Sequence, residues 1–179
     1  NMGDTRLKYA FQQGAVGYVI KYVGASVSST GSVTYHNASE AVNWLLYRLS
    51  DIYLMKAEAM IELDSTSVQV IPYINKTYTR SNAGIEELSP INYAGKSQLR
   101  DLLRTERNRE FLFEGKRWFD LIRYARIDNN PQSIVLVVAD NTGSAEAYKL
   151  SDPNSWFLPV PLADISSSLG ALIQNPFYE

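Results

Sequence analysis

The sequence contains no cysteine and one histidine, His36, among its 179 residues. The absence of cysteine excludes disulfides, thiolate metal ligands and a cysteine nucleophile. With a single histidine, a metal site built from several histidines is also excluded, and a Ser-His-Asp triad could use only His36. No Walker or GxGxxG pattern is present to cradle a phosphate group. The sequence therefore predicts no cofactor and no metal.

An excess of charge of one sign is also missing, because 17 Lys and Arg stand against 19 Asp and Glu, which gives a net charge of −2. Proteins that bind nucleic acid concentrate basic charge on one face, so this balance predicts no nucleic-acid partner. No stretch approaches the roughly 18 consecutive apolar residues that a membrane-spanning helix needs. Any association with a membrane must then come from something other than a hydrophobic segment of this chain.

The residue pattern predicts a mainly α-helical chain. Apolar residues at helical spacing predict helices over 41–63, 68–79 and 97–126, and a short helix near 162–169. β-Branched runs predict short strands near 16–23 and within 133–150. The helical pairs resemble tetratricopeptide (TPR) repeats without matching their consensus. We divide the chain into a helical core at 41–126 and a hairpin with a proline-rich closing segment at 127–179.

Three glutamates, Glu106, Glu110 and Glu114, recur every four residues and so share one face of the predicted helix 97–126. Two carboxylates about 6 Å apart are typical of a retaining glycosidase, but such carboxylates flank a cleft from opposite sides. The alternative is structural, with Glu–Arg pairs tying this helix to its neighbours through Arg48 and Glu58. We favour the structural role and predict no catalytic residue.

Three segments carry a resemblance to a known family. Residues 47–59 (YRLSDIYLMKAEA) are similar to its R-x-A-D-x-x-L-x-x-A-E-A helix, and residues 106–123 (ERNREFLFEGKRWFDLIR) to its ER-x-x-EF-x-x-EG-x-RW-x-DL-x-R helix. Residues 158–161 (LPVP) and 174–178 (QNPFY) are similar to its PIP…QNPGY ending. Together they resemble the C-terminal part of the SusD/RagB family of outer-membrane nutrient-binding lipoproteins. Ser50 stands where the family usually has alanine, and Phe177 where it has glycine.

The resemblance implies which residues form the family's scaffold motifs. A glycine inside the predicted helix 97–126 costs about 1 kcal/mol relative to alanine, so we expect Gly115 to permit the close approach of another backbone. Trp118 has Leu121 and Ile122 on the same helix face, which favours core packing over sugar stacking. The scaffold residues are Arg48, Glu58, Glu106, Arg107, Glu110, Gly115, Arg117, Trp118, Asp120 and Arg123.

The resemblance also implies a fold and a role for the whole chain. Residues 1–179 would be the C-terminal part of a SusD-like domain whose N-terminal half, signal and anchor cysteine lie upstream. Such proteins are not enzymes: they capture glycans, or peptides in some branches, at the cell surface. They act as the lid of a TonB-dependent, SusC-like outer-membrane transporter and are held at the outer membrane by a lipid anchor. A TPR-like protein-interaction module is the alternative function.

Sugar sites need aromatic faces and polar groups presented by loops on a rigid scaffold. Trp44 and Trp118 lie in apolar helical stripes and Trp156 lies beside the proline-rich closing segment, so we expect all three to be structural. The tyrosines within residues 1–40, by contrast, lie among small and polar residues. We therefore predict that the glycan contacts of this chain come from Tyr18, Tyr22 and Tyr35.

Overall fold

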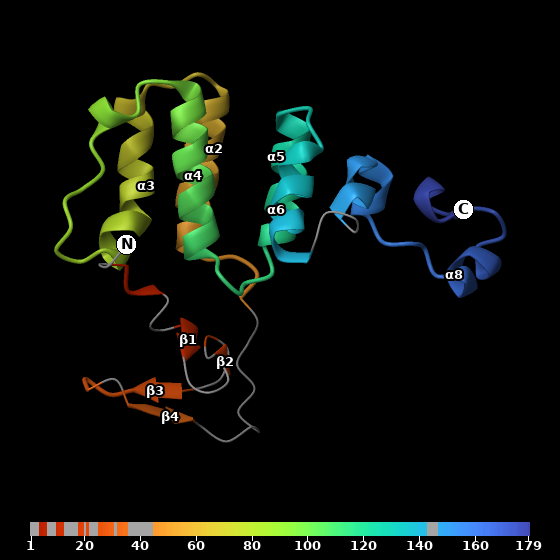
Figure 1. The fold of residues 1–179 in the computed structure, drawn as a ribbon, viewed down its shortest axis with the longest axis horizontal. Helices are drawn as coiled ribbons and strands as arrows, with labels where there is room; N and C mark the ends of the chain where they lie inside the picture. Colours follow the sequence, from red (N-terminus) through yellow and green to blue (C-terminus); the bar gives the residue numbers. More distant parts are fainter. Residues whose placement is uncertain are drawn as a thin grey trace. The chain divides into compact units, whose positions relative to one another are not determined.

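The computed structural model describes residues 4–6, 10–12, 18–19, 21, 25–30, 32–35, 45–142 and 147–179. The chain divides into two compact units, Asn1–Gly115 and Lys116–Glu179. Each unit owes its core to helices (Figure 1). The predicted mainly helical fold class is therefore confirmed.

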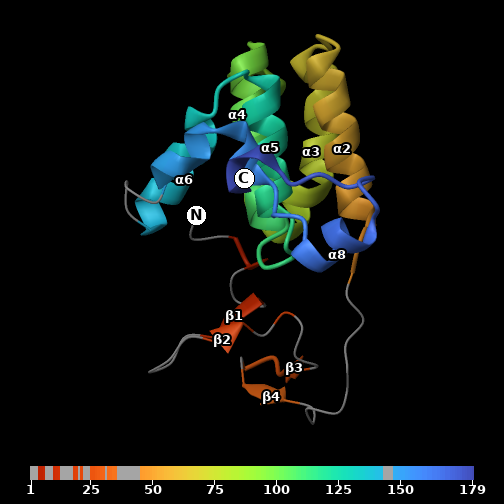
Figure 2. The same cartoon turned by 90° about the vertical axis from the view of Figure 1, so that its right-hand side faces the viewer.

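Three helices form the core of the first unit: α2 (Leu49–Glu62), α3 (Ser67–Ser81) and α4 (Lys96–Glu110). They pack side by side, with α2 against both of the others (Figures 1 and 2). A capping box begins α3, in which Oε1 of Gln69 accepts hydrogen bonds from the backbone N–H and the hydroxyl of Thr66. The buried side chains between these helices are Leu54, Ala57, Ile61, Val70, Ile71, Ile74, Leu99, Leu103 and Phe111.

Helix α2 begins at Leu49, later than the predicted start at residue 41. Arg48, the residue before the helix, has an extended backbone (φ −144°, ψ 169°). Its N–H donates to Oδ2 of Asp51 at 3.1 Å, which fixes the start of the helix at this point. Residues 45–48 are not helical, and residues 41–44 lie outside the described part of the chain.

The prediction of one continuous helix over 97–126 is wrong. Helix α4 ends at Glu110, and a new helix, α5 (Arg117–Ile127), follows. Phe113 and Gly115, which lie between them, have positive φ angles of 62° and 71°. This left-handed backbone ends a helix and favours glycine. Gly115 therefore lies in a turn and not inside a helix, and the close backbone approach expected of it stays a prediction.

Cationic side chains donate hydrogen bonds to backbone carbonyls at and just after the end of α4. Nη2 of Arg48 donates to the carbonyl of Glu110 at 2.7 Å, and Nζ of Lys21 donates to the carbonyl of Leu112 at 2.9 Å. The last carbonyls of a helix have no partner inside it, and positive charge is favourable there. The break after Glu110 is thus stabilised by residues that lie 60 or more positions away in the sequence.

Strands in the first unit are short. β1 (Phe11–Gln12) pairs with β2 (Tyr18–Val19), and β3 (Ala25–Val27) pairs with β4 (Val33–Tyr35), both antiparallel. β2 falls within the predicted strand 16–23, whereas the β3–β4 hairpin lies outside the predicted strands.

The predicted hairpin within 133–150 is wrong, because α6 (Gln132–Thr142) is helical and η2 (Lys149–Ser151) is a 3-10 turn. Asn130 begins α6, since its Oδ1 accepts the N–H of Gln132 at 3.0 Å. Helix α6 packs against α5, and this burial outweighs the modest strand preference of the β-branched side chains. The core of the second unit consists of Leu121, Ile122, Ala125, Ile134 and Trp156.

The closing segment contains η3 (Pro153–Trp156), α8 (Leu162–Ser167) and η4 (Pro176–Tyr178), so the short helix predicted near 162–169 is confirmed. The side-chain amide of Gln174 accepts the N–H of Val160 at 2.9 Å and donates to its carbonyl at 3.0 Å. The Gln174 side chain therefore joins the two halves of the third motif, 158–161 and 174–178. It pairs with the backbone of Val160 as the backbone of a neighbouring strand would. No helix among the described residues is long and apolar enough to cross a membrane.

Candidate functional site

The tyrosines predicted to contact a ligand lie in or beside the N-terminal strands. The backbone of Tyr18 belongs to β2 and that of Tyr35 to β4. Tyr22, and the side chains of the other two, lie outside the described residues. Their role in ligand binding stays a prediction.

The most densely charged feature among the described residues surrounds the C-terminal end of α4, and we call it the glutamate cluster. Glu106, Glu110 and Glu114 are buried, with exposed fractions of 1%, 2% and 2%. Buried carboxylates are costly unless they are paired. Their cationic partners are Arg6, Lys21, Arg48 and Arg80.

Glu110 is the centre of the cluster. Its carboxylate accepts Nη1 of Arg48 at 2.5 Å, Nη1 of Arg6 at 3.2 Å, and a hydrogen bond from Arg80. These cations come from the N-terminal segment, the start of α2 and the end of α3. One side chain therefore joins α4 to three other segments of the first unit.

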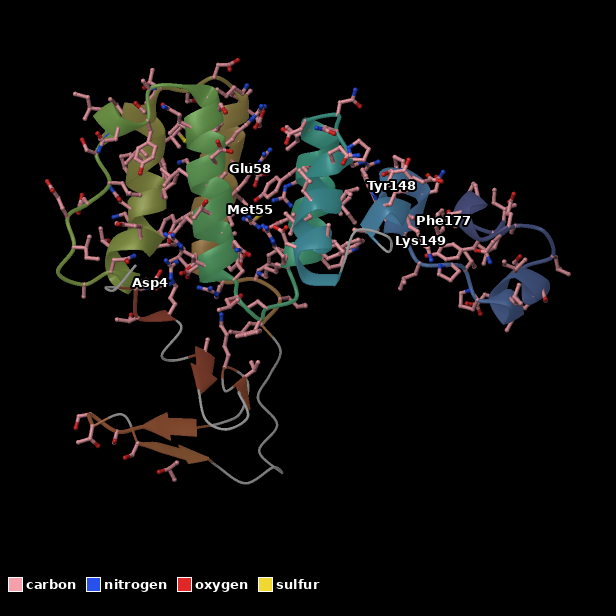
Figure 3. All side chains as sticks on the ribbon, viewed as in Figure 1. Asp4, Met55, Glu58, Tyr148, Lys149 and Phe177 are labelled. Carbon is pink, nitrogen blue, oxygen red and sulfur yellow. The ribbon has the colours of Figure 1, made fainter. Side chains whose placement is uncertain are left out.

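The other two glutamates extend the same arrangement. The carboxylate of Glu106 accepts a hydrogen bond from Nη1 of Arg6 at 2.8 Å, and Asp4 (labelled in Figure 3) forms an ion pair with the same guanidinium at 2.6 Å. Glu114 lies in the turn after α4. Its carboxylate accepts hydrogen bonds from Nζ of Lys21 at 2.6 Å and from Nη2 of Arg48 at 2.8 Å. The predicted partnership of Arg48 with the helix glutamates is thus confirmed, although Glu114 reaches it from a turn rather than from a helix.

The structure explains one departure from the family pattern, the serine at position 50 in place of the usual alanine. This buried serine accepts hydrogen bonds on Oγ from Arg48 at 2.7 Å and from Arg80 at 3.3 Å. An alanine, which is usual at this position in the family pattern, has no oxygen for either guanidinium. The sequence showed the substitution, but only the structure shows that it holds two cations of the cluster.

The remaining scaffold residues of the first unit lie near the cluster or on α2. Arg107 is buried, and its guanidinium lies 4.9 Å from the centre of the Phe111 ring. Glu58 lies on α2, where it is half-buried, close in sequence to Met55 (Figure 3).

In the second unit, the scaffold residues lie on α5. Arg117 is its first residue. Asp120 is buried and pairs with Arg123 one turn later at 2.9 Å. Trp118 is half-buried against the core of this unit, and Trp156 is buried there. The prediction that tryptophans are structural is confirmed for Trp118 and Trp156, and Trp44 lies outside the described residues.

Arginine neighbours set the protonation of Glu110. Burial by itself would raise the pKa of this carboxyl, but the hydrogen bond and charge of Arg48, with Ser50 and Arg80, outweigh burial and hold the pKa below its usual value. Hydrogen bonding to Arg6 likewise lowers the pKa of Asp4. For Arg48, the hydrogen bonds to Glu114 and Glu110 outweigh burial, which alone would lower its pKa, and raise it above its usual value.

This geometry does not suit glycoside hydrolysis. The acid of a glycosidase needs a raised pKa so that it can donate a proton, whereas that of Glu110 is lowered. Glu106 and Glu110 also accept the same nitrogen of Arg6, so they do not face each other across a cleft. A cavity of about 340 Å³ borders the cluster, but Glu110 and Glu114, which line it, are engaged by cations. No group of acidic or histidine side chains in the described part of the chain could hold a metal ion.

The lowered carboxyl pKa values predict a loss of stability in acid. A group whose pKa is depressed by folding stabilises the protein above its unfolded pKa, which for Asp and Glu is about 4, and this contribution disappears as the pH falls through the folded value. We therefore expect the melting temperature to decrease when the pH is lowered below about 4.5, because Glu110 and Asp4 then take up protons. The measurement is a series of thermal melts from pH 6 to pH 2.5.

The matched control for this titration is Glu110→Gln, which cannot take up the proton. It should start from a lower melting temperature at pH 6 and lose less on acidification. Equal acid-induced losses in the two proteins would contradict the assignment to Glu110.

Comparison with known proteins identifies the family. The model of the SusD family matches residues 12–178. The chain belongs to the SusD family. Two relatives come from Formosa agariphila. SusD-like protein P2 is 25% identical over 141 residues, which are 77% of this chain and 26% of the relative. SusD-like protein P38 is 30% identical over 101 residues, which are 54% of this chain and 20% of the relative.

The chain thus spans about a quarter or less of the length of these relatives. Its match to the SusD family covers both structural units, and all three motifs of the predicted resemblance lie within it. The second SusD motif of this chain, residues 106–123, supplies the three carboxylates of the glutamate cluster. Through them it stabilises the end of α4 and connects this helix to α2, α3 and the N-terminal segment.

Proposed function

We propose that the protein is a cell-surface glycan-binding component that works with a TonB-dependent, SusC-like transporter in polysaccharide uptake. The observation that carries the proposal is the SusD-family match over residues 12–178. In this proposal the protein is held at the outer membrane by a lipid attached outside these 179 residues. The oligosaccharide is bound and delivered unchanged.

A binding role rather than a catalytic one is supported by the glutamate cluster. The carboxylates that could have served as acid and nucleophile are buried and held by arginines. These ion pairs stabilise the fold of the first unit, and the pKa of Glu110 is lowered, whereas proton donation requires a raised pKa.

Calorimetry on the protein in its full natural length tests the function. The probes are five neutral hexasaccharides: maltohexaose, cellohexaose, laminarihexaose, xylohexaose and mannohexaose. We expect saturable binding of at least one, with no shortened product on prolonged incubation. Binding of peptides but of no glycan would favour a peptide-binding member of the family, and binding of neither would favour a TPR-like protein-interaction module.

The location of the contact is a separate prediction. Tyr18, Tyr22 and Tyr35 are proposed to stack on sugar rings, and removing such contacts weakens binding. We expect their combined replacement by alanine to weaken the binding of the best hexasaccharide at least tenfold, as measured by calorimetry. Replacing Tyr148, an exposed tyrosine of the second unit, is the control. Undiminished affinity in the folded triple variant would show that these tyrosines are not the contact.

A further inference from the structure

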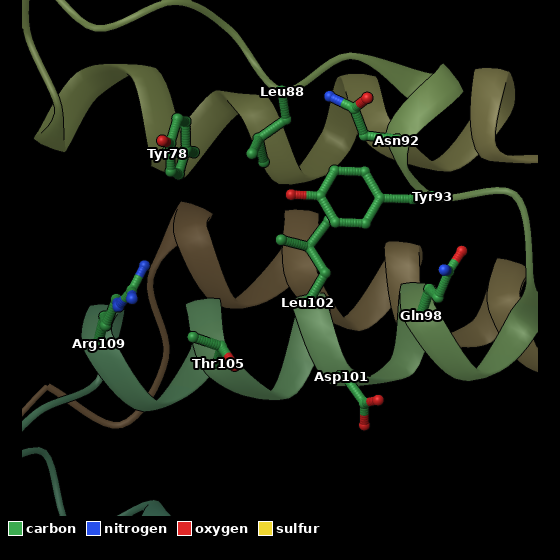
Figure 4. A pocket seen from close by; sticks show the side chains of 9 residues that line it. All are labelled: Tyr78, Leu88, Asn92, Tyr93, Gln98, Asp101, Leu102, Thr105 and Arg109. Atoms are coloured by element: carbon green, nitrogen blue, oxygen red, sulfur yellow. The ribbon is translucent and has the colours of Figure 1, made fainter. Parts of the chain in front are cut away.

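A second cleft of the first unit lies next to the cavity of the glutamate cluster, and Arg109 lines both. It has a volume of about 440 Å³ and lies between the C-terminal half of α3, the 82–95 connection and one face of α4 (Figure 4). Pockets of several hundred Å³ with an apolar floor and a few convergent polar groups are typical of small-molecule sites. Tyr78 comes from α3, Asn92 and Tyr93 from the connection, and Arg109 from α4.

The floor of the cleft is apolar and part of the core. Leu88, Tyr93 and Leu102 pack against the buried cluster of the first unit. In Figure 4 the Tyr93 ring lies between Leu88 and Leu102, and its hydroxyl points toward the end of the cleft where Tyr78 and Arg109 lie. The half-buried ring therefore offers a fixed apolar surface with a polar tip.

The connection that carries Tyr93 is held in place on both sides. The side-chain amide of Asn75 accepts the N–H of Leu88 and donates to its carbonyl, each at 3.1 Å. The 3-10 turn η1 (Pro90–Asn92) then sets Tyr93, whose N–H donates to the carbonyl of Pro90 at 3.1 Å. A wall that is already ordered loses little conformational entropy when a ligand binds.

Several polar groups of the cleft have unused hydrogen-bonding capacity. Within the described part of the chain, no side-chain hydrogen bond is made by Tyr78, Asn92, Tyr93 or Arg109. Together they offer two hydroxyls and an amide, which both donate and accept hydrogen bonds, and a guanidinium, which only donates them. The charged lining residues, Asp101 and Arg109, have opposite signs, so the cleft has no net preference for an ion.

We propose that this cleft binds a neutral oligosaccharide. A sugar ring presents C–H groups that pack on an aromatic face and hydroxyls that both donate and accept hydrogen bonds, which matches Tyr93 and the four unused polar groups. A peptide is a poorer match, because peptide recognition relies on a sheet edge, a long apolar groove or a charge cluster, none of which lines this cleft. The inference rests on the proposed glycan-binding function and adds a second surface to it.

The experiment uses the protein in its full natural length and the five neutral hexasaccharides named above. The test variant is Asn92→Ala with Arg109→Ala, and Tyr93→Phe is a second variant that removes one hydroxyl while keeping the ring on the core. The control is Lys76→Ala with Asn108→Ala, two exposed residues on α3 and α4 outside the cleft. Thermal melts verify that each variant is folded.

For a hexasaccharide that binds the unmodified protein, we expect the double variant either to bind about tenfold more weakly or to lose one binding equivalent. The Tyr93→Phe variant should show a smaller effect in the same direction, and the control none. Unchanged affinity and stoichiometry in both cleft variants would overturn this inference and leave the proposed function intact. If the unmodified protein binds none of the five sugars, the cleft assignment and the proposed function both fail.

Discussion

Replacing Glu110 with alanine is expected to lower the free energy of unfolding by about 3–5 kcal/mol. The carboxylate is 2% exposed and accepts hydrogen bonds from Arg6, Arg48 and Arg80. Its loss leaves at least two partly buried guanidinium groups without their central acceptor, and an unpaired buried charge costs more than the pair contributed. Urea denaturation of the full-length protein, followed by circular dichroism, measures the change.

Glu87→Ala is the matched control, because Glu87 is exposed in the 82–95 connection, and such substitutions change stability by about 0.5 kcal/mol or less. A double-mutant cycle with Arg48→Met sharpens the test. Because Arg48 and Glu110 are in contact, the double variant should lose clearly less than the sum of the two single losses. Additive losses, or a Glu110→Ala protein as stable as the control, would contradict the central role of Glu110.

Trp156→Ala is expected to destabilise the second unit by about 3–5 kcal/mol. Trp156 is 6% exposed, belongs to the core of this unit, and its indole N–H donates to the carbonyl of Leu150 at 2.8 Å. Truncation leaves a large cavity and an unpaired carbonyl. Hydrogen-exchange mass spectrometry of the full-length protein should show faster exchange in α5 and α6.

Phe157 provides the control for Trp156, since the neighbouring aromatic residue is 50% exposed. Phe157→Ala should leave the exchange of α5 and α6 nearly unchanged. If the two variants exchanged alike, the closing segment would contribute no core to the second unit, and the interpretation of Trp156 as a structural residue would be wrong.

The errors of the sequence-based predictions share a physical cause. The run at 133–139 has the β-branched residues of a strand, yet it is helical, because Asn130 begins a helix there and its apolar side chains pack on α5. The continuous pattern over 97–126 conceals a break, because the cations that stabilise the end of α4 come from Lys21 and Arg48. Local patterns carry no information about such distant partners.

The cleft of Tyr78 and Tyr93 was missed for a related reason. The 82–95 segment contains the glycine and proline typical of a loop, and nothing in it identifies its neighbours. The amide of Asn75 holds it against α3, and this contact brings Tyr93 beside one face of α4. The only available signal was the combination of tyrosine and asparagine in a short connection, which is too common to identify a site.

The sequence by itself determined the family, the helical character and the scaffold role of the glutamates, because periodicity and motif order are local properties that survive without a partner. The tertiary structure decided where the long helix breaks, that residues 132–142 form a helix, and which cations hold each carboxylate. It also decided that Ser50 supports two arginines and that Tyr93 lies beside Leu88 and Leu102. These outcomes depend on contacts between residues far apart in the chain, and the free energy of such contacts arises only when the segments pack together.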